Sequence, residues 1–377
     1  MEFKREIVAP IVRGMSSDGE TPLIVTFLET NKAELTLVAQ EVNATTIEKW
    51  RNQFNTFLKE KQRYPKSVKV DGEGWSLGVG RTLEEARMAQ GAPLTKRVVT
   101  RGDVMRGKVA LVTGGAQGFG AGIVRGLIGE GGIAYIADMN FEGAKELANQ
   151  LNRDAGREVA IPLFVNVTDE ASVEEMMNQV ALKTGSLDIF VSNAGVLRAG
   201  SVKEQTLKDF QFVTNVDYTG FFICSKFASR QMSYQNLGSG NTHFSDIIVI
   251  SSKSGLEGSN RNGSYAGAKF GVIGLTQSFA LELVSDKIKV NAICPGNFFE
   301  GPLWSDPVTG LFVQYLETGK VPGAKTLHDV RRAYESKVPL DRGCRTEDVV
   351  RAICYVVEQK YETGQAVPVT GGQVMLN

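Results

Sequence analysis

Three side chains in the second half of the sequence have the types and spacing for acid–base chemistry. Tyr265 and Lys269 are four residues apart at the start of an apolar helical stretch, so they share one helix face about 6 Å apart along its axis. A phenol with a pKa of about 10 is a weak base at neutral pH, but a neighbouring ammonium group favours its ionised form. Such a phenol can donate a proton to a forming alkoxide or accept one from a carbinol. This spacing alone also arises by chance in many proteins.

A hydroxyl for the substrate oxygen is available thirteen residues earlier. Ser252 ends the apolar stretch 247–252 (IIVISS), and we expect its hydroxyl to hold the oxygen of a carbinol or carbonyl. Lys253 and Arg261 bracket the loop between Ser252 and Tyr265. Either cation could contact an anionic group of a substrate through charge-assisted hydrogen bonds. The alternative is that both are solvated surface cations.

A glycine-rich segment, residues 113–120 (TGGAQGFG), could bind a dinucleotide. It follows one predicted strand and opens one predicted helix, so its backbone can approach a pyrophosphate while the helix N-terminus offers free N–H groups. Asp138 lies near the end of the next predicted strand, 18 residues after Gly120. A carboxylate there can accept hydrogen bonds from the adenosine ribose and would repel a 2′-phosphate. We therefore predict NAD in preference to NADP; ordinary tight turns would also use glycine and aspartate.

The elements that must position these groups alternate along the chain from about residue 107. The predicted strands are 108–115, 133–140, 160–169, 187–195, 245–255, 288–296 and 366–372, and helical stretches separate most of them. Continuously apolar strands separated by helices are typical of a parallel sheet covered on both faces. We therefore predict an α/β fold with a doubly wound parallel (Rossmann) sheet over residues 103–377.

Residues 1–102 follow a different pattern and are predicted to form a small α/β appendage, since 377 residues exceed one ordinary domain. Strands are expected at 22–27 and 34–40, a helix at 44–63, a hairpin over 67–81 and a second helix from residue 82. A polar connection, 91–103, then leads into the second domain.

The composition argues against several classes of protein. Forty-two basic residues balance forty-two acidic ones, so no broad attraction to nucleic acid or an anionic membrane is expected. The sequence has no run of 18 apolar residues, and its N-terminus does not resemble a signal peptide. Four cysteines without CxxC spacing and only two histidines argue against a metal site. We expect a cytoplasmic protein with free thiols.

Taken together, these motifs make residues 107–377 resemble the short-chain dehydrogenase/reductase family. The matching positions are Gly114, Gly118 and Gly120 of the glycine motif, Asn193, Ala194 and Gly195 of the Asn-Ala-Gly motif, the helix asparagine Asn215, the triad Ser252, Tyr265 and Lys269, and Pro295-Gly296. The resemblance implies hydride transfer between a nicotinamide cofactor and a carbinol or carbonyl. It assigns catalysis to Asn215, Ser252, Tyr265 and Lys269, with Asn215 holding a water that relays protons from Lys269.

The resemblance also implies the residues that surround NAD. These are Gly114, Gln117, Gly118, Phe119, Gly120, Asp138, Asn166, Val167, Asn193, Ala194, Gly195, Tyr265, Lys269, Pro295 and Gly296. Ser192 replaces the first asparagine of the Asn-Asn-Ala-Gly motif. Asn166 replaces an aspartate that often meets the adenine amine, and Asn297 follows Pro-Gly where a threonine is common. The adenine and carboxamide contacts are therefore left open. The family commonly forms dimers or tetramers, which implies a homodimer or homotetramer here.

Three longer stretches, 251–278, 337–344 and 362–375, are similar to family members that interconvert D-sorbitol 6-phosphate and D-fructose 6-phosphate. A polyol or sugar phosphate is therefore the expected substrate. Residues 297–337 carry few helix signals and are expected to form a mobile lid or an ordered crossover, with Arg331 and Arg332 as further phosphate ligands. The alternatives are a dehydrogenase for another polyol, a sugar or lactaldehyde, or a non-catalytic binding protein on the same fold.

Part of the N-terminal segment, 64–89, is similar to the linker of fused bacterial proteins that join an aldolase to a dehydrogenase. Those aldolases bind metal through histidine, and residues 1–106 contain no histidine. The segment is therefore predicted to be a remnant without aldolase activity. The sequence leaves open whether it caps the active site, extends a subunit interface or does neither.

Overall fold

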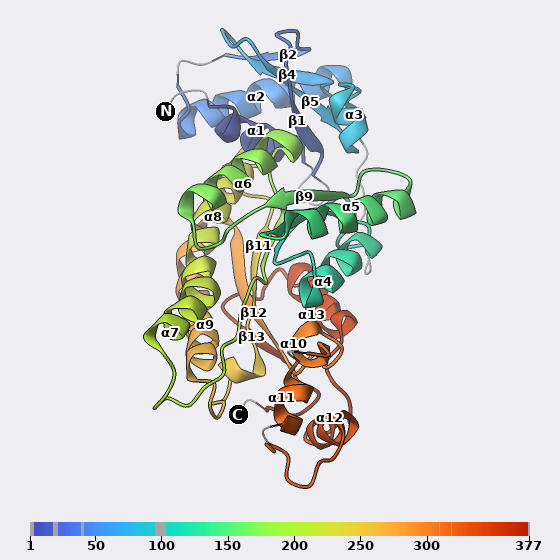
Figure 1. Ribbon diagram of the computed structural model, residues 1–377. Helices are drawn as coiled ribbons and strands as arrows, with labels where there is room; N and C mark the ends of the chain where they lie inside the picture. The colour runs from blue at the N-terminus through green and yellow to red at the C-terminus, as the bar shows by residue number, and fades with distance from the viewer. Residues whose placement is uncertain are drawn as a thin grey trace.

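The computed structural model describes residues 4–17, 22–38, 41–94, 103–308, 310–317 and 319–375. Its centre is a parallel sheet (Figure 1). The sheet has seven strands in the order β13-β12-β11-β10-β7-β8-β9. The strands are β7 (Val109–Thr113), β8 (Ile133–Asp138), β9 (Ala160–Phe164), β10 (Ile189–Ser192), β11 (Ser245–Ile250), β12 (Ile288–Pro295) and β13 (Ala366–Val369). The strand order reverses between β7 and β10, which leaves a crevice at their carboxyl ends. The predicted doubly wound sheet is confirmed.

Helices cover both faces of this sheet, because its inner strands bury the side chains on both sides. One face packs against α6 (Glu170–Thr184), α8 (Gly220–Gly238) and α9 (Gly263–Leu283). The other face packs against α4 (Gly118–Gly129), α5 (Phe141–Ala155) and α13 (Thr346–Glu358). A helix α7 (Leu207–Thr214) leads through a π-helical turn, η1 (Asn215–Thr219), directly into α8. Two short 3-10 turns, η2 (Lys253–Gly255) and η3 (Val284–Asp286), flank α9.

The N-terminal segment forms a four-stranded sheet in the order β1-β5-β4-β2 with its own apolar core. Its elements are α1 (Arg5–Met15), β1 (Ile24–Leu28), β2 (Leu35–Leu37), α2 (Ala44–Lys61), β3 (Arg63–Tyr64), β4 (Ser67–Val70), β5 (Ser76–Gly80), α3 (Leu83–Arg87) and β6 (Ala92–Pro93). The predicted hairpin is the antiparallel pair β4–β5. Helix α1 was not predicted, because Pro10 lies in its middle. The expected boundary after residue 102 adjoins 95–102, which lie outside the described residues.

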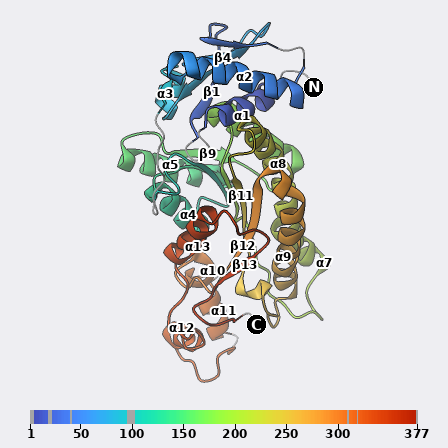
Figure 2. The same cartoon turned by 180° about the vertical axis from the view of Figure 1, so that it is seen from behind.

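This N-terminal segment lies at the end of the parallel sheet where the strands begin (Figures 1 and 2). Helix α1 crosses α8 so closely that a Cβ on Gly14 would lie 1.9 Å from the carbonyl oxygen of Gln235. The fully buried Arg13 donates two hydrogen bonds to Asp188, which directly precedes β10, at 2.9 and 2.8 Å. Asp188 also accepts from the backbone N–H of Val109, at 2.7 Å, where β7 begins. The ion pair therefore anchors α1 to two central strands.

The carboxyl ends of the strands are covered instead by a small helical lid between β12 and α13. The lid contains α10 (Pro302–Ser305), α11 (Leu311–Glu317) and α12 (Leu327–Glu335), and its own core is built around Phe299, Trp304 and Phe312. Residues 297–337, for which few helix signals and either a mobile lid or an ordered crossover were expected, contain these three short helices. Among the described residues, no helix is both long and apolar enough to cross a membrane.

Candidate active site

The glycine-rich loop joins β7 to the first turn of α4. A Cβ on Gly120 would lie 1.9 Å from the carbonyl oxygen of Gly114, so only glycine lets the helix pack this closely on the loop. Asn193, at the end of β10, donates its side-chain amide to the carbonyl oxygens of Thr113 and Gly114, at 2.9 and 3.1 Å. These contacts hold the loop open toward the crevice, where the first N–H groups of α4 are available to an anion.

Asp138 ends β8 beside this loop. Its carboxylate accepts hydrogen bonds from the backbone N–H groups of Ala116, at 3.0 Å, and Asn140, at 2.9 Å. These two bonds orient the carboxylate toward the cavity that the loop lines. Asn166 and Val167, which follow β9, line the same cavity. The side-chain oxygen of Asn166 accepts hydrogen bonds from the backbone N–H and the hydroxyl of Thr168.

Tyr265 and Lys269 lie one turn apart on α9, as the spacing requires, and Lys269 Nζ is 5.5 Å from the centre of the Tyr265 ring. Lys269 donates a hydrogen bond from its side chain to the carbonyl oxygen of Ile250, at 3.1 Å. The hydroxyl of Ser251 donates to the backbone carbonyl oxygen of Lys269, at 2.9 Å. The end of β11 is thereby fastened to α9. Ser252, the next residue, contributes its hydroxyl to the same place.

Burial raises the pKa of Tyr265 above its ordinary value. The ammonium group of Lys269 and a hydrogen bond with Ser252 oppose this rise, while the negative charge of Asp217 adds to it. Burial would lower the pKa of Lys269, but Asp217 and Tyr265 together hold it above its ordinary value. Tyr265 is therefore a protonated phenol at neutral pH, held beside a charged lysine.

Asn215, the residue expected to hold a water that relays protons from Lys269, lies outside the lining of the cavity. Asn215 is exposed, whereas Asp217 is buried and lies 3.2 Å from Lys269 Nζ. The other oxygen of Asp217 accepts from the backbone N–H of Val196, at 2.7 Å. Both residues lie on the π-helical turn, and π-helical turns are frequent at functional sites. Asp217 was missed because nothing in the sequence marks such a turn.

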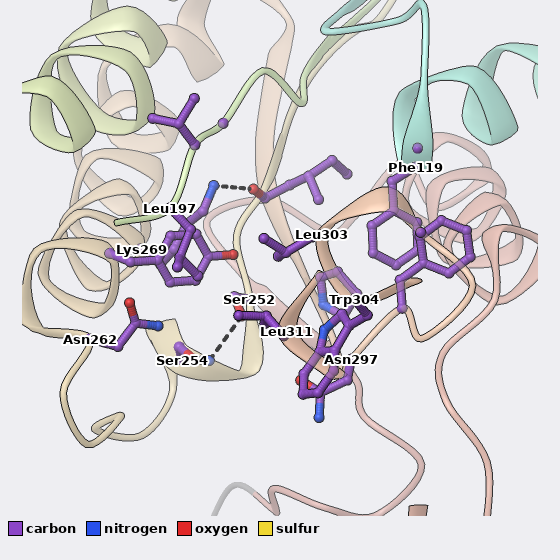
Figure 3. A pocket seen from close by; sticks show the side chains of 18 of the residues that line it. Phe119, Leu197, Ser252, Ser254, Asn262, Lys269, Asn297, Leu303, Trp304 and Leu311 are labelled. Carbon is purple, nitrogen blue, oxygen red and sulfur yellow. Dashed lines mark hydrogen bonds between the residues drawn. The ribbon is translucent and has the colours of Figure 1, made fainter. Parts of the chain in front are cut away.

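These elements enclose a cavity of about 940 Å³. All of the expected cofactor residues line it except Gly120, which shapes the loop from behind. Figure 3 shows Lys269 and Ser252 on the side of α9 and Phe119 on the opposite side, with Leu303 and Trp304 of the lid projecting into the space. Phe119 stacks on Phe298, with ring centres 4.4 Å apart, so the lid touches the glycine loop.

The expected phosphate ligands are only partly brought together. Lys253 and Arg261 both line the cavity, but Lys253 lies 3.7 Å from Glu257. Arg331 is engaged by Glu300 and Glu335, each at 2.7 Å, and neither Arg331 nor Arg332 lines the cavity. The lid instead contributes two lysines that the sequence analysis did not single out, Lys320 and Lys337.

The shape and chemistry of this cavity fit a nicotinamide dinucleotide. The glycine cradle admits a pyrophosphate, Asp138 can receive ribose hydroxyls, and Pro295 and Gly296 border the space beside Tyr265. Asp138, Asn193 and the α4 N-terminus would hold the adenosine half, and Tyr265 and Lys269 the nicotinamide half. The volume leaves room for a small substrate at the lid.

Comparison with known proteins agrees with this geometry. A family model described as short chain dehydrogenase matches residues 108–302. The sorbitol-6-phosphate 2-dehydrogenase of Escherichia coli (strain K12) is 35% identical over 271 residues, which cover 71% of this chain and 99% of that protein.

Solved structures give the same result. Sorbitol-6-phosphate 2-dehydrogenase from Erwinia amylovora is 38% identical with a TM-score of 0.65, over 71% of this chain and 100% of that one. An actinorhodin polyketide ketoreductase variant with NADPH is 27% identical with a TM-score of 0.60, over 71% and 97%. Proteins of this kind use NAD or NADP and act on small molecules. The chain belongs to the short-chain dehydrogenase family and is an oxidoreductase.

Proposed function

We propose that this protein is an NAD-dependent polyol-phosphate dehydrogenase that interconverts D-sorbitol 6-phosphate and D-fructose 6-phosphate. One observation carries the proposal: Ser252, Tyr265 and Lys269 meet on one wall of a cavity that reaches from Asp138 to the lysines of the lid. The likeness to two sorbitol-6-phosphate 2-dehydrogenases supports the substrate.

The residues divide the chemistry between them. Bound NAD supplies a hydride acceptor for the carbinol carbon. Ser252 holds the carbinol oxygen by a hydrogen bond, and Tyr265 removes its proton on oxidation or returns it on reduction. Lys269 favours the phenolate of Tyr265 by its charge. Since burial raises the pKa of Tyr265, the protonated phenol suits ketone reduction at neutral pH, and alcohol oxidation gains as the pH rises.

A polyol also needs partners for its other hydroxyl groups. Asn262, beside the start of α9, lines the cavity, and its side-chain oxygen is buried without a hydrogen-bond partner among the described residues. It is available to accept a hydrogen bond from a substrate hydroxyl. The carboxylate of Asp138 supports NAD over NADP, because a 2′-phosphate would lie against a negative charge.

The test is to follow NADH absorbance with D-sorbitol 6-phosphate, D-sorbitol, lactaldehyde and a small set of other polyols. We expect kcat/KM for D-sorbitol 6-phosphate to exceed that for D-sorbitol by more than about tenfold, or ~1.4 kcal/mol. A smaller preference would argue for the alternative of a dehydrogenase for an unphosphorylated polyol, sugar or lactaldehyde. Absence of turnover with every compound, while NAD still binds, would argue for a binding protein.

We further propose a homodimer or homotetramer working in the cytoplasm. The helices α8 and α9 expose apolar side chains, among them Phe222, Phe270 and Leu281, which a second copy of the chain would bury. The described cysteines are all free thiols, which suits a reducing compartment. Light scattering coupled to size-exclusion chromatography tests the oligomeric state.

A further inference from the structure

Two lysines of the lid are held against aromatic rings at the wall of the cavity. Tyr315 of α11 and Tyr334 of α12 stack with ring centres 5.4 Å apart and planes inclined by 21°. Lys320 Nζ lies 3.9 Å from the centre of the Tyr315 ring, and Lys337 Nζ lies 4.2 Å from the centre of the Tyr334 ring. All four residues line the cavity. Cation–π contacts of this length restrain an ammonium group without neutralising its charge.

The charges of these lysines are not balanced by carboxylates. Within the described residues, neither Lys320 nor Lys337 forms a salt bridge, in contrast to Lys253, which pairs with Glu257, and Arg331. Partial burial lowers the pKa of Lys320, and the positive charges of Arg261 and Lys337 lower it further. Lys320 therefore experiences the positive charges of both Arg261 and Lys337.

Arg261 brings a third positive charge to the wall of the same cavity. It belongs to the loop between Ser252 and Tyr265, and its only salt-bridge partner among the described residues is the exposed Glu204, at 3.7 Å. Such an exposed pair contributes little, so the guanidinium group remains available to a better partner. The catalytic loop and the lid thus present cations to the same space.

We propose that Lys320, Lys337 and Arg261 form the subsite that binds the phosphate group of the substrate. The inference rests on the proposed function and specifies how that site selects its substrate class. A phosphate dianion would offset the repulsion that Lys320 experiences from Arg261 and Lys337, and would accept charge-assisted hydrogen bonds from these cations. An unphosphorylated polyol would leave that repulsion in place, so the subsite favours the phosphorylated compound. Lys253 is outside this subsite, because its pair with Glu257 is less exposed than the pair of Arg261 with Glu204 and therefore offsets its charge more.

The test compares Lys320→Gln, Lys337→Gln and the double variant with wild type, using D-sorbitol 6-phosphate and D-sorbitol as substrates. We expect each single change to lower kcat/KM for D-sorbitol 6-phosphate about 10- to 100-fold, because each removes a charged hydrogen-bond partner. The value for D-sorbitol should change less than about twofold. Lys325→Gln is the matched control, since Lys325 is an exposed lid lysine that does not line the cavity.

A binding measurement separates this inference from the proposed function. Calorimetric titration of D-sorbitol 6-phosphate into the protein with NADH reports the subsite without turnover. If wild type binds D-sorbitol 6-phosphate tightly and the lysine substitutions weaken this binding, the subsite is supported. This holds even if wild type proves inactive, and that inactivity would contradict only the proposed function. Turnover of D-sorbitol 6-phosphate that is unaffected by the double variant, or lowered equally for both substrates, overturns the subsite and leaves the proposed function standing. Recovery of phosphate selectivity in Lys320→Arg would support it, because arginine keeps the charge.

Discussion

The carboxylate of Asp217 lies 3.2 Å from the ammonium group of Lys269, and both residues are buried. The ammonium group of Lys269 therefore interacts with two acidic groups, the phenol of Tyr265 and the carboxylate of Asp217 on the adjoining helix. Burial raises the pKa of Asp217, and the charge of Lys269 only partly opposes this rise. Asp217 is a positioning residue: it touches Lys269 and the loop at Val196, and acts on Tyr265 through its charge.

Asp217→Asn should move the pH dependence of alcohol oxidation to lower pH. The negative charge of Asp217 raises the pKa of Tyr265, so an uncharged amide lets the phenol lose its proton at lower pH. Asparagine can still accept the hydrogen bond from Val196, which keeps the loop in place. The check is the pH profile of kcat. An unchanged profile with an unchanged KM for NAD would mean that Asp217 has only a structural role.

Tyr265→Phe should lower kcat by about 10² to 10⁴, because the proton acceptor is removed while the ring remains. NAD binding, measured by fluorescence titration of NADH, should persist within a few-fold. The control is Tyr361→Phe, which alters a fully exposed tyrosine outside the cavity. A Tyr265→Phe variant with wild-type turnover would remove the basis for assigning acid–base catalysis to α9.

Asp138→Asn should relax the preference for NAD over NADP. The N–H groups of Ala116 and Asn140 donate to different oxygens of Asp138, so the single amide oxygen can keep one of these bonds while the repulsion of a 2′-phosphate is lost. We expect the ratio of kcat/KM for NAD to that for NADP to fall by about tenfold, or ~1.4 kcal/mol. Asp154→Asn, an exposed change on α5, serves as the control. A wild type with no preference for NAD would contradict the role given to Asp138.

Arg13→Met should destabilise the protein by about 3–5 kcal/mol, because it leaves the buried carboxylate of Asp188 without its main partner. Burial alone would raise the pKa of Asp188, but the charge of Arg13 holds it well below the ordinary value. Urea unfolding followed by circular dichroism measures the effect. Arg5→Met on the same helix removes only an exposed contact with the Phe27 ring and should cost about 0.5–1 kcal/mol. Equal effects of the two changes would mean that the buried pair does not anchor α1.

The sequence predicted the parallel sheet well, because its strands are buried on both faces and so read as uninterrupted apolar stretches. Helix α1 was not predicted, because Pro10 lies at its centre and proline disfavours a helix interior. Packing against α8 stabilises this helix in the folded protein. For residues 297–337, the sequence left two alternatives, a mobile lid and an ordered crossover. The short helices of this segment depend on aromatic contacts between residues that are far apart in the sequence. Trp304 contacts Phe299, and it also contacts Tyr334, which lies 30 residues later.

What the sequence determined by itself is local: the glycine turn, the aspartate ending the second strand, and a tyrosine and a lysine one helical turn apart. Backbone geometry links such residues over a few positions, so their spacing carries the information. The tertiary structure alone decided that Asp217 rather than Asn215 meets Lys269, that Lys320 and Lys337 join Arg261, and that the N-terminal segment lies at the end of the sheet away from the cavity. These contacts join residues from separate elements, and only the packing of those elements fixes which side chains meet.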